Sequence, residues 1–210
     1  MIKRMSAAVG IVLAAGCLAG LGGCGREKAH SGGEYEADEV SAVYMEADTW
    51  NIHMAVSSDD KIQVSFEGDV SKGAPQPEVQ LHKSVLQVVQ KRGKETLGDK
   101  IAFGKKGEIT VCLPEKSRLS MEIHNGSGDI QMERVEVWDF QLENDSGYAV
   151  FADAIMEQAQ VTSRSGDITW KGGEAKNISM DMASGYGAVK QTVFGSVEAS
   201  AGSGEIQISG

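Results

Sequence analysis

The chain has 210 residues, with 20 Lys and Arg against 30 Asp and Glu, which gives a formal net charge of −10 at pH 7. A surface this acidic disfavours nucleic acids and anionic lipid headgroups as partners. The four histidines lack the spacing of a zinc site, and we expect neither a metal nor another cofactor.

Residues 1–23 have the pattern of a lipoprotein signal peptide. A basic start, Lys3-Arg4, precedes an apolar run that ends in Leu21-Gly22-Gly23-Cys24. This ending resembles a bacterial lipobox, and the resemblance implies that Cys24 is lipidated and becomes the first residue of the mature protein. The expected location is then the extracytoplasmic side of the cell envelope, with a membrane anchor. The alternative is an ordinary signal or a plain transmembrane anchor.

Residues 24–39 are polar, charged and Gly-containing, and we interpret them as a flexible tether. From residue 40 onward apolar and polar residues alternate, which predicts strands at 40–45, 50–56, 61–66, 79–82, 85–90 and 108–113. We interpret residues 40–118 as a β-rich N-terminal module. It would cap the first edge of the repeat region that follows, because an unpaired edge strand invites association.

Residues 119–210 contain a Ser-Gly pair that recurs five times at intervals of 19 residues. Apolar residues stand seven and five positions before each glycine, polar residues stand between them, and a second inward pair follows the glycine. A fixed period of this length is typical of a stacked solenoid. Antiparallel hairpins could share the period, but stacked coils better explain the repeated inward positions. We therefore predict an all-β fold, a single-stranded parallel β-solenoid of about five 19-residue coils.

Each Ser-Gly pair is interpreted as a structural turn. We expect the glycine to supply a positive φ at the corner, in particular at Gly147 and Gly166, because bulky residues rarely hold that conformation. Asn125 and Asn144 are interpreted as turn formers at the start of two of these corners. The five turn glycines are Gly128, Gly147, Gly166, Gly185 and Gly204.

The lipobox, the strand closed by Pro114 and the repeated Ser-Gly-Asp-Ile turns resemble a bacterial family of candidate adhesins. The resemblance covers about residues 40–210 and rests on five equal spacings rather than on any single motif. It implies a β-solenoid fold in a surface lipoprotein or an envelope-stress-associated protein, and it supplies no catalytic residues. The chain departs from the family pattern at Tyr148 and Tyr186, where Asp usually follows Ser-Gly.

The outward positions directly after the five glycines form a ladder in which acids and tyrosines alternate. The structural interpretation is that the acids tie down the turns and the tyrosines are exposed β-formers. The alternatives are a calcium site, a carboxylate pair of a glycosidase or lyase, and a ligand surface. Because acids interleaved with aromatic rings suit sugar stacking or a cationic peptide, we hypothesise that the ladder faces the ligand. The ladder residues are Asp129, Tyr148, Asp167, Tyr186 and Glu205.

These patterns predict a non-enzymatic envelope lipoprotein that displays its β-solenoid for adhesion, sensing or scaffolding. Its expected partners are the membrane, through Cys24, and a cell-wall glycan or an envelope protein. One alternative is a carbohydrate-active enzyme on the same fold. Another is an accessory partner of a membrane protein that signals envelope stress.

Overall fold

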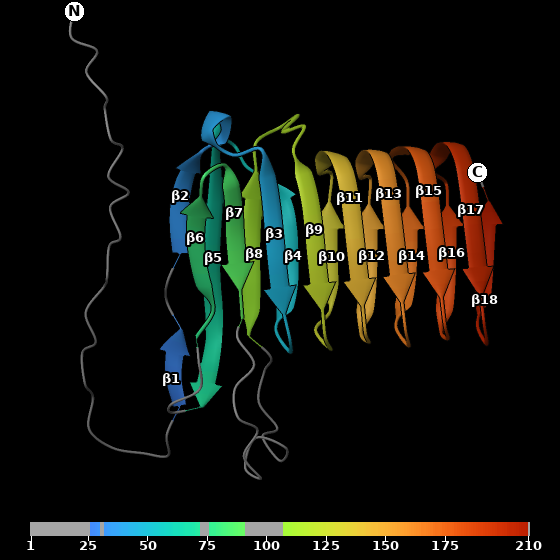
Figure 1. The fold of residues 1–210 in the computed structure, drawn as a ribbon, viewed down its shortest axis with the longest axis horizontal. Helices are drawn as coiled ribbons and strands as arrows, with labels where there is room; N and C mark the ends of the chain where they lie inside the picture. Colours follow the sequence, from blue (N-terminus) through green and yellow to red (C-terminus); the bar gives the residue numbers. More distant parts are fainter. Residues whose placement is uncertain (1–25, 30–31, 72–75, 91–106, 210) are drawn as a thin grey trace, which may run out of the picture.

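The computed structural model describes residues 26–29, 32–71, 76–90 and 107–209. In this part of the chain two β-sheets face each other and form a flattened solenoid, whose long axis is horizontal in Figure 1. Each coil contributes one strand to each sheet, so the chain turns from one sheet to the other at every Ser-Gly corner. The helical structure in the described residues is one short 3₁₀ turn, η1 (Ala37–Glu39).

The 19-residue repeats form five stacked coils with parallel pairing, which confirms the predicted fold. Equivalent residues are register partners, as in Phe140 with Ala159 and Ala159 with Ile178. Because the shift between partners is always one repeat, every coil places the same positions inward. The strands of the five coils are β9 (Ser120–Asn125) and β10 (Ile130–Glu133), β11 (Glu136–Asn144) and β12 (Tyr148–Ala152), β13 (Ile155–Ser163) and β14 (Asp167–Lys171), β15 (Glu174–Met182) and β16 (Tyr186–Lys190), and β17 (Val193–Ala201) and β18 (Glu205–Ser209).

The core consists of rows of inward side chains that run along the solenoid. In one row Met132, Phe151, Trp170 and Val189 are all fully buried and are partners in register. The ring of Phe151 packs edge-on against Trp170, at 5.3 Å between centroids, and against Phe140 of the opposite sheet, at 5.2 Å. Such contacts add to the burial of apolar area, so the aromatic cluster ties the two sheets together.

Two further rungs of the solenoid come from residues before Arg118. Strands β3 (Ala42–Ala47) and β4 (Asn51–Val56) pair in parallel with β9 and β10. Strands β7 (Val85–Val89) and β8 (Glu108–Leu113) pair in parallel with the other edges of β3 and β4. The rung of β3 and β4 comes first in the chain. It therefore lies between the rung of β7 and β8 and the rung of β9 and β10. Both sheets run without a break through the expected boundary between module and solenoid.

The first edge of the solenoid is covered by antiparallel strands at the left of Figure 1. Strand β5 (Lys61–Ser71) pairs with β8, and β6 (Glu78–His82) pairs with β7. On the outer side of β5 lie β2 (Gly32–Glu36) and β1 (Arg26–Ala29), both antiparallel to it. These strands occupy the backbone hydrogen-bonding groups that would otherwise form an open edge.

The expectation of a flexible tether over residues 24–39 is wrong for β1, β2 and η1. Strand β8 pairs with residues 63–67 of β5, and the outer edge of the 11-residue strand β5 remains open, so it pairs with β2 over residues 61–65 and with β1 over residues 68–71. Tyr35 packs against the core from β2. Pairing of this kind uses main-chain groups, which explains why a polar sequence with one apolar anchor gave no strand signal.

Buried polar side chains hold the corners at one end of the strands. The Oε1 of Gln90 accepts hydrogen bonds from the backbone N–H groups of residues 48, 49 and 50, at 3.0 to 3.2 Å. Asn125 donates from Nδ2 to the carbonyl oxygen of Gly128 at 2.7 Å, and Ser163 donates from Oγ to that of Gly166 at 3.1 Å. Asn144 reaches the carbonyl of Gly147 at 3.4 Å. Asn125 and Asn144 are therefore turn formers, as predicted.

Candidate functional site

The predicted ladder of acids and tyrosines exists in the structure. Tyr148 pairs in register with Asp167, and Tyr186 pairs with Glu205, all on the sheet of β10 to β18. Asp129 directly precedes Ile130, which pairs with the residue after Tyr148, so it continues the same row. The ladder residues are thus neighbours on consecutive coils, where the chain enters this sheet. Figure 1 shows the strands that follow them, β10, β12, β14, β16 and β18, side by side.

Two of the ladder acids have a structural role. The backbone N–H of Tyr148 donates to Asp129 Oδ1 at 3.0 Å, and that of Tyr186 donates to Asp167 Oδ1 at 2.8 Å. Each carboxylate therefore supplies the acceptor that links its coil to the next one. This is the turn-stabilising role that the structural interpretation expects, extended from one coil to its neighbour.

The φ angle of the glycine before each ladder residue depends on whether that residue is a tyrosine or an acid. Gly147 and Gly185 precede the tyrosines and have φ values of +94° and +103°. Their carbonyl oxygens accept the backbone N–H of Asp167 and Glu205, both at 3.2 Å. Because tyrosine has no side-chain acceptor in this position, the glycine carbonyl takes over the link, and the positive φ accompanies that arrangement.

The expected positive φ at Gly166 is wrong, and Gly128 and Gly204 do not have one either. At Gly166 the aspartate that follows provides the link to the next coil, and the glycine carbonyl instead accepts the hydroxyl of Ser163. Gly166 is required for another reason. A Cβ there would lie 2.4 Å from the carbonyl oxygen of Gly147, which is closer than real Cβ contacts come.

Only part of the ladder is available to a ligand. Tyr148 is 62% exposed and lies beside Val150, another exposed apolar residue on β12. Tyr186 is half-buried, and its hydroxyl donates to Gln207 Oε1 at 2.7 Å. The Lys190 ammonium donates to the same hydroxyl at 3.1 Å and lies 5.6 Å from the ring centroid. Of the two ladder tyrosines, Tyr148 is therefore the better placed to contact a partner.

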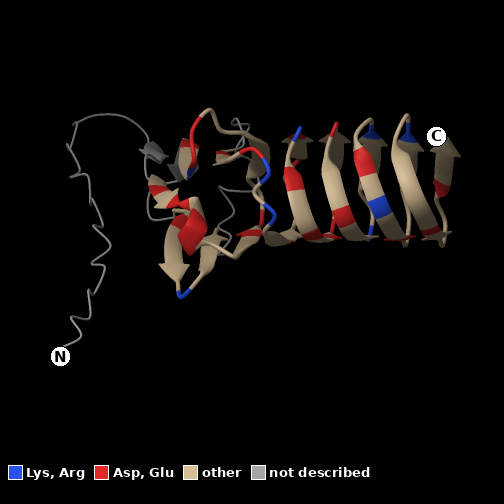
Figure 2. Ribbon diagram, turned by 90° about the horizontal axis from the view of Figure 1, so that it is seen from above, with Lys and Arg blue, Asp and Glu red and all other residues tan. Residues whose placement is uncertain are grey.

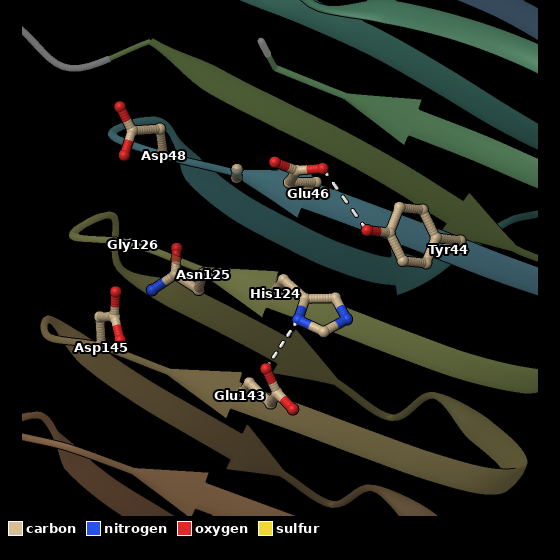
Figure 3. Close-up of a pocket in the computed structure, with 9 residues that line it drawn as sticks. Tyr44, Glu46, Asp48, His124, Asn125, Gly126, Glu143 and Asp145 are labelled. Atoms are coloured by element: carbon tan, nitrogen blue, oxygen red, sulfur yellow. Dashed lines mark hydrogen bonds and ion pairs between the residues drawn. The ribbon is translucent and has the colours of Figure 1, made fainter. Parts of the chain in front are cut away.

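The opposite sheet carries an acidic groove across β3, β9 and β11 that the sequence analysis did not identify. The groove has a volume of about 300 Å³, and Figure 3 shows its side chains from neighbouring strands. Its walls are two rows of outward residues, one containing Glu46, His124 and Glu143, the other containing Asp48 and Asp145. The lining residues are Tyr44, Glu46, Ala47, Asp48, His124, Asn125, Gly126, Glu143 and Asp145.

His124 lies between two carboxylates in this groove. Its Nε2 is 2.7 Å from Glu122 Oε1, and its Nδ1 is 2.9 Å from Glu143 Oε2. Both carboxylates are acceptors, so the two hydrogen bonds coexist only when the imidazole is doubly protonated. Partial burial lowers the pKa of His124, but the hydrogen bond with Glu122 and the charge and hydrogen bond of Glu143 outweigh it. The net pKa therefore lies above the usual histidine value.

The stability of the protein is expected to depend on pH through His124. Because its pKa is raised on folding, its contribution is full below the unfolded-state value of about 6.5 and is lost as the pH rises through the folded-state pKa. The charged or titratable groups facing the ring are Glu122 on its own strand, Tyr44 and Glu46 on β3, and Glu143 on β11. Urea unfolding of wild type and His124→Gln should therefore differ more at about pH 6 than at about pH 9. An equal difference at both pH values would contradict the stabilising role of the protonated His124 side chain between Glu122 and Glu143.

The groove has no signal in the sequence because its residues are far apart in the chain. Tyr44 and Glu46 become neighbours of His124 only because β3 inserts beside β9.

Within the described part of the chain, no group of three or more His, Cys, Asp or Glu side chains is arranged to hold a metal ion. Cys24 and the predicted signal lie outside the described residues. No helix in the described residues is both long enough and apolar enough to cross a membrane.

Comparisons with known proteins found similar solved structures. A candidate cell adhesion protein from Clostridium sporogenes is 13% identical, with a TM-score of 0.56, and the match covers 87% of this chain and 99% of that one. A candidate adhesin from Bacteroides fragilis is 14% identical, with a TM-score of 0.39 and coverage of 87% and 98%. A candidate lipid-binding protein from Parabacteroides distasonis is 13% identical, with a TM-score of 0.40 and coverage of 86% and 97%. No curated protein matches the sequence.

The first of these structures shows the fold alone, because the sequence identity is low. The family model described as Toastrack DUF4097 matches residues 40–210, which include the repeats, the two additional rungs and the antiparallel strands β5 and β6. The chain therefore belongs to the Toastrack DUF4097 family.

Proposed function

We propose that the protein is a non-catalytic envelope lipoprotein that displays its solenoid for adhesion. The observation that carries this proposal is the regular presentation of outward side chains. Both sheets place equivalent residues of successive coils side by side, at the strand spacing of about 4.8 Å. Such a body offers extended faces to a long ligand. The likeness to a candidate cell adhesion protein supports this proposal at the level of the fold.

The ladder geometry favours binding over glycoside hydrolysis. A glycosidase needs one carboxyl group to protonate the leaving oxygen and a second to act as nucleophile or base. Asp129 and Asp167 instead use a carboxylate oxygen to accept a backbone N–H of the next coil. Tyr148 stands between them in the row. In a turnover assay on polysaccharides, wild type, Asp129→Ala and Asp167→Ala should therefore give the same result, because neither aspartate supports hydrolysis.

Anchoring is the first testable part of the proposal. Changing Cys24 to Ala should move the protein from the membrane fraction to the soluble fraction, because a lipid chain supplies membrane affinity that an acidic surface does not. Fractionation of cells followed by immunoblotting measures the distribution. The control is Cys17→Ala, which leaves Cys24 intact and should remain in the membrane fraction. A Cys24→Ala protein that still sediments with membranes would show that the anchor lies elsewhere.

Adhesion is tested separately, on cells that carry the full-length protein. Cells expressing wild type should adhere to a glycan-coated or cell-coated surface more strongly than cells lacking the gene. Cells expressing Cys24→Ala should behave like the deletion strain, because the solenoid is no longer displayed. Equal adhesion of all three strains would overturn the proposed function.

A further inference from the structure

A second furrow crosses β11, β13, β15 and β17 and has a volume of about 370 Å³. Its walls are two parallel rows of outward polar side chains, and its floor is the backbone around Phe140, Ala159 and Ile178, whose side chains are buried. The rows are in register from coil to coil. We call it the amide furrow. One wall is formed by Asp139, Gln158, Asn177 and Ser196, and the other by Gln141, Gln160, Ser179 and Glu198.

The glutamines of this furrow have no hydrogen-bond partner among the described residues, although every other glutamine in a described strand has one. Gln141, Gln158 and Gln160 are exposed and unpaired. Asn177 uses its Oδ1 to accept the Ser196 hydroxyl at 2.7 Å. The paired strand glutamines elsewhere are Gln63, Gln80, Gln87, Gln131 and Gln207. The unpaired glutamines of the described strands therefore all lie in this furrow.

The centre of the furrow carries no charge, which is unusual on this acidic chain. Figure 2 shows acidic positions distributed along the solenoid, with few basic positions among them. In the furrow the acids lie at the two ends, Asp139 on β11 and Glu198 on β17. The nearby Lys176 ammonium lies 3.3 Å from Glu157, which neutralises it. Neither a polyanion nor a polycation finds complementary charge between these ends.

The lining favours a ligand rich in hydroxyl groups. An amide both donates and accepts hydrogen bonds, as a sugar hydroxyl does. Successive coils repeat the pair of wall residues every 4.8 Å or so, and this spacing is close to the length of one hexose in an extended glycan. Gln158 with Gln160 and Asn177 with Ser179 would then meet successive sugars in the same way.

We propose that the amide furrow binds an extended neutral polysaccharide that lies along the solenoid axis. This inference rests on the proposed adhesive function and assigns its ligand class and its site. Binding should strengthen with ligand length, because each added sugar meets another rung until the furrow is filled. The ligand is held by hydrogen bonds to exposed amides, so each contact is weak and affinity comes from their number.

The test uses chitohexaose, cellohexaose, their disaccharides and a charged alginate hexamer in calorimetric titrations of the full chain. We expect at least one neutral hexamer to bind, its disaccharide to bind much more weakly and alginate not to bind. The double variant Gln158→Ala/Gln160→Ala should weaken hexamer binding about thirtyfold, the effect of two lost hydrogen bonds. The matched control Gln131→Ala/Gln207→Ala removes two strand glutamines from the opposite sheet and should bind like wild type.

The furrow variant should unfold like wild type, because Gln158 and Gln160 are exposed and unpaired. Absence of binding by both neutral hexamers, equal binding by wild type and furrow variant, or preference for a lysine-rich peptide would each overturn the inference. Adhesion of cells that carry the furrow variant separates the two proposals. If these cells adhere as well as wild type, the furrow is not the adhesive site while the adhesive function stands. If wild-type cells do not adhere, the proposed function itself fails.

Discussion

Replacing Trp170 with Ala is expected to lower the free energy of unfolding by about 3–5 kcal/mol. Trp170 is fully buried in the middle of the solenoid and contacts the ring of Phe151 at 5.3 Å between centroids. Its register partners are Phe151 on one side and Val189 on the other. Because backbone hydrogen bonds fix the spacing of the coils, neighbouring strands cannot close in to fill the cavity that the missing indole ring leaves. Urea unfolding followed by circular dichroism measures the change.

Trp170→Phe is the matched control for this prediction. The Nε1 of Trp170 is buried without a hydrogen-bond partner among the described residues. An unsatisfied donor of this kind is destabilising, so its removal partly compensates for the smaller ring. We expect Trp170→Phe to cost less than about 1.5 kcal/mol. Equal losses for both variants would show that the ring's volume is not what stabilises this rung.

Replacing Gly166 with Val is expected to cost about 3 kcal/mol, because the coils are too close to admit a side chain there. The Cβ would lie 2.2 Å from Asn144 Nδ2 and 2.4 Å from the carbonyl oxygen of Gly147. That oxygen belongs to the backbone and accepts the N–H of Asp167, so it cannot move away without loosening the link between coils. Thermal and urea unfolding provide the measurement.

The control introduces the same side chain one residue earlier. Ser165 is exposed on the turn, and Ser165→Val should change the stability by less than about 0.5 kcal/mol. If Gly166→Val unfolds at the wild-type urea concentration, neighbouring corners can separate at little cost, and the close approach is not a requirement of the fold.

The repeats of this protein could be predicted because their signal is local and periodic. The interval of 19 residues sets the register, and period-2 alternation sets which side chains face inward, so Phe140, Ala159 and Ile178 were correctly placed in one row. The ladder from Asp129 to Glu205 follows from the same register. What the repeat could not show is that each ladder residue determines how its coil is linked to the next one.

The conformations of the glycines illustrate this limit. Gly147 and Gly166 stand in equivalent places and both follow serine, yet only Gly147 has a positive φ. The difference arises because Asp167 supplies an acceptor to the next coil and Tyr148 does not. A hydrogen bond between coils is a tertiary interaction, and a prediction based on one turn at a time does not include it.

The amino-acid sequence by itself determined the fold class, the register of the five coils and the inward rows, because each depends on the pattern within a repeat or on its recurrence every 19 residues. The tertiary structure alone decided the order of the first rungs, in which β3 and β4 insert between strands that come later in the chain. The same insertion creates the acidic groove around His124. The amide furrow likewise depends on which polar side chains remain unpaired once the coils stack. The contact of β3 with β9 joins distant segments and carries no periodic signal, so the acidic groove becomes visible only when the chain is folded.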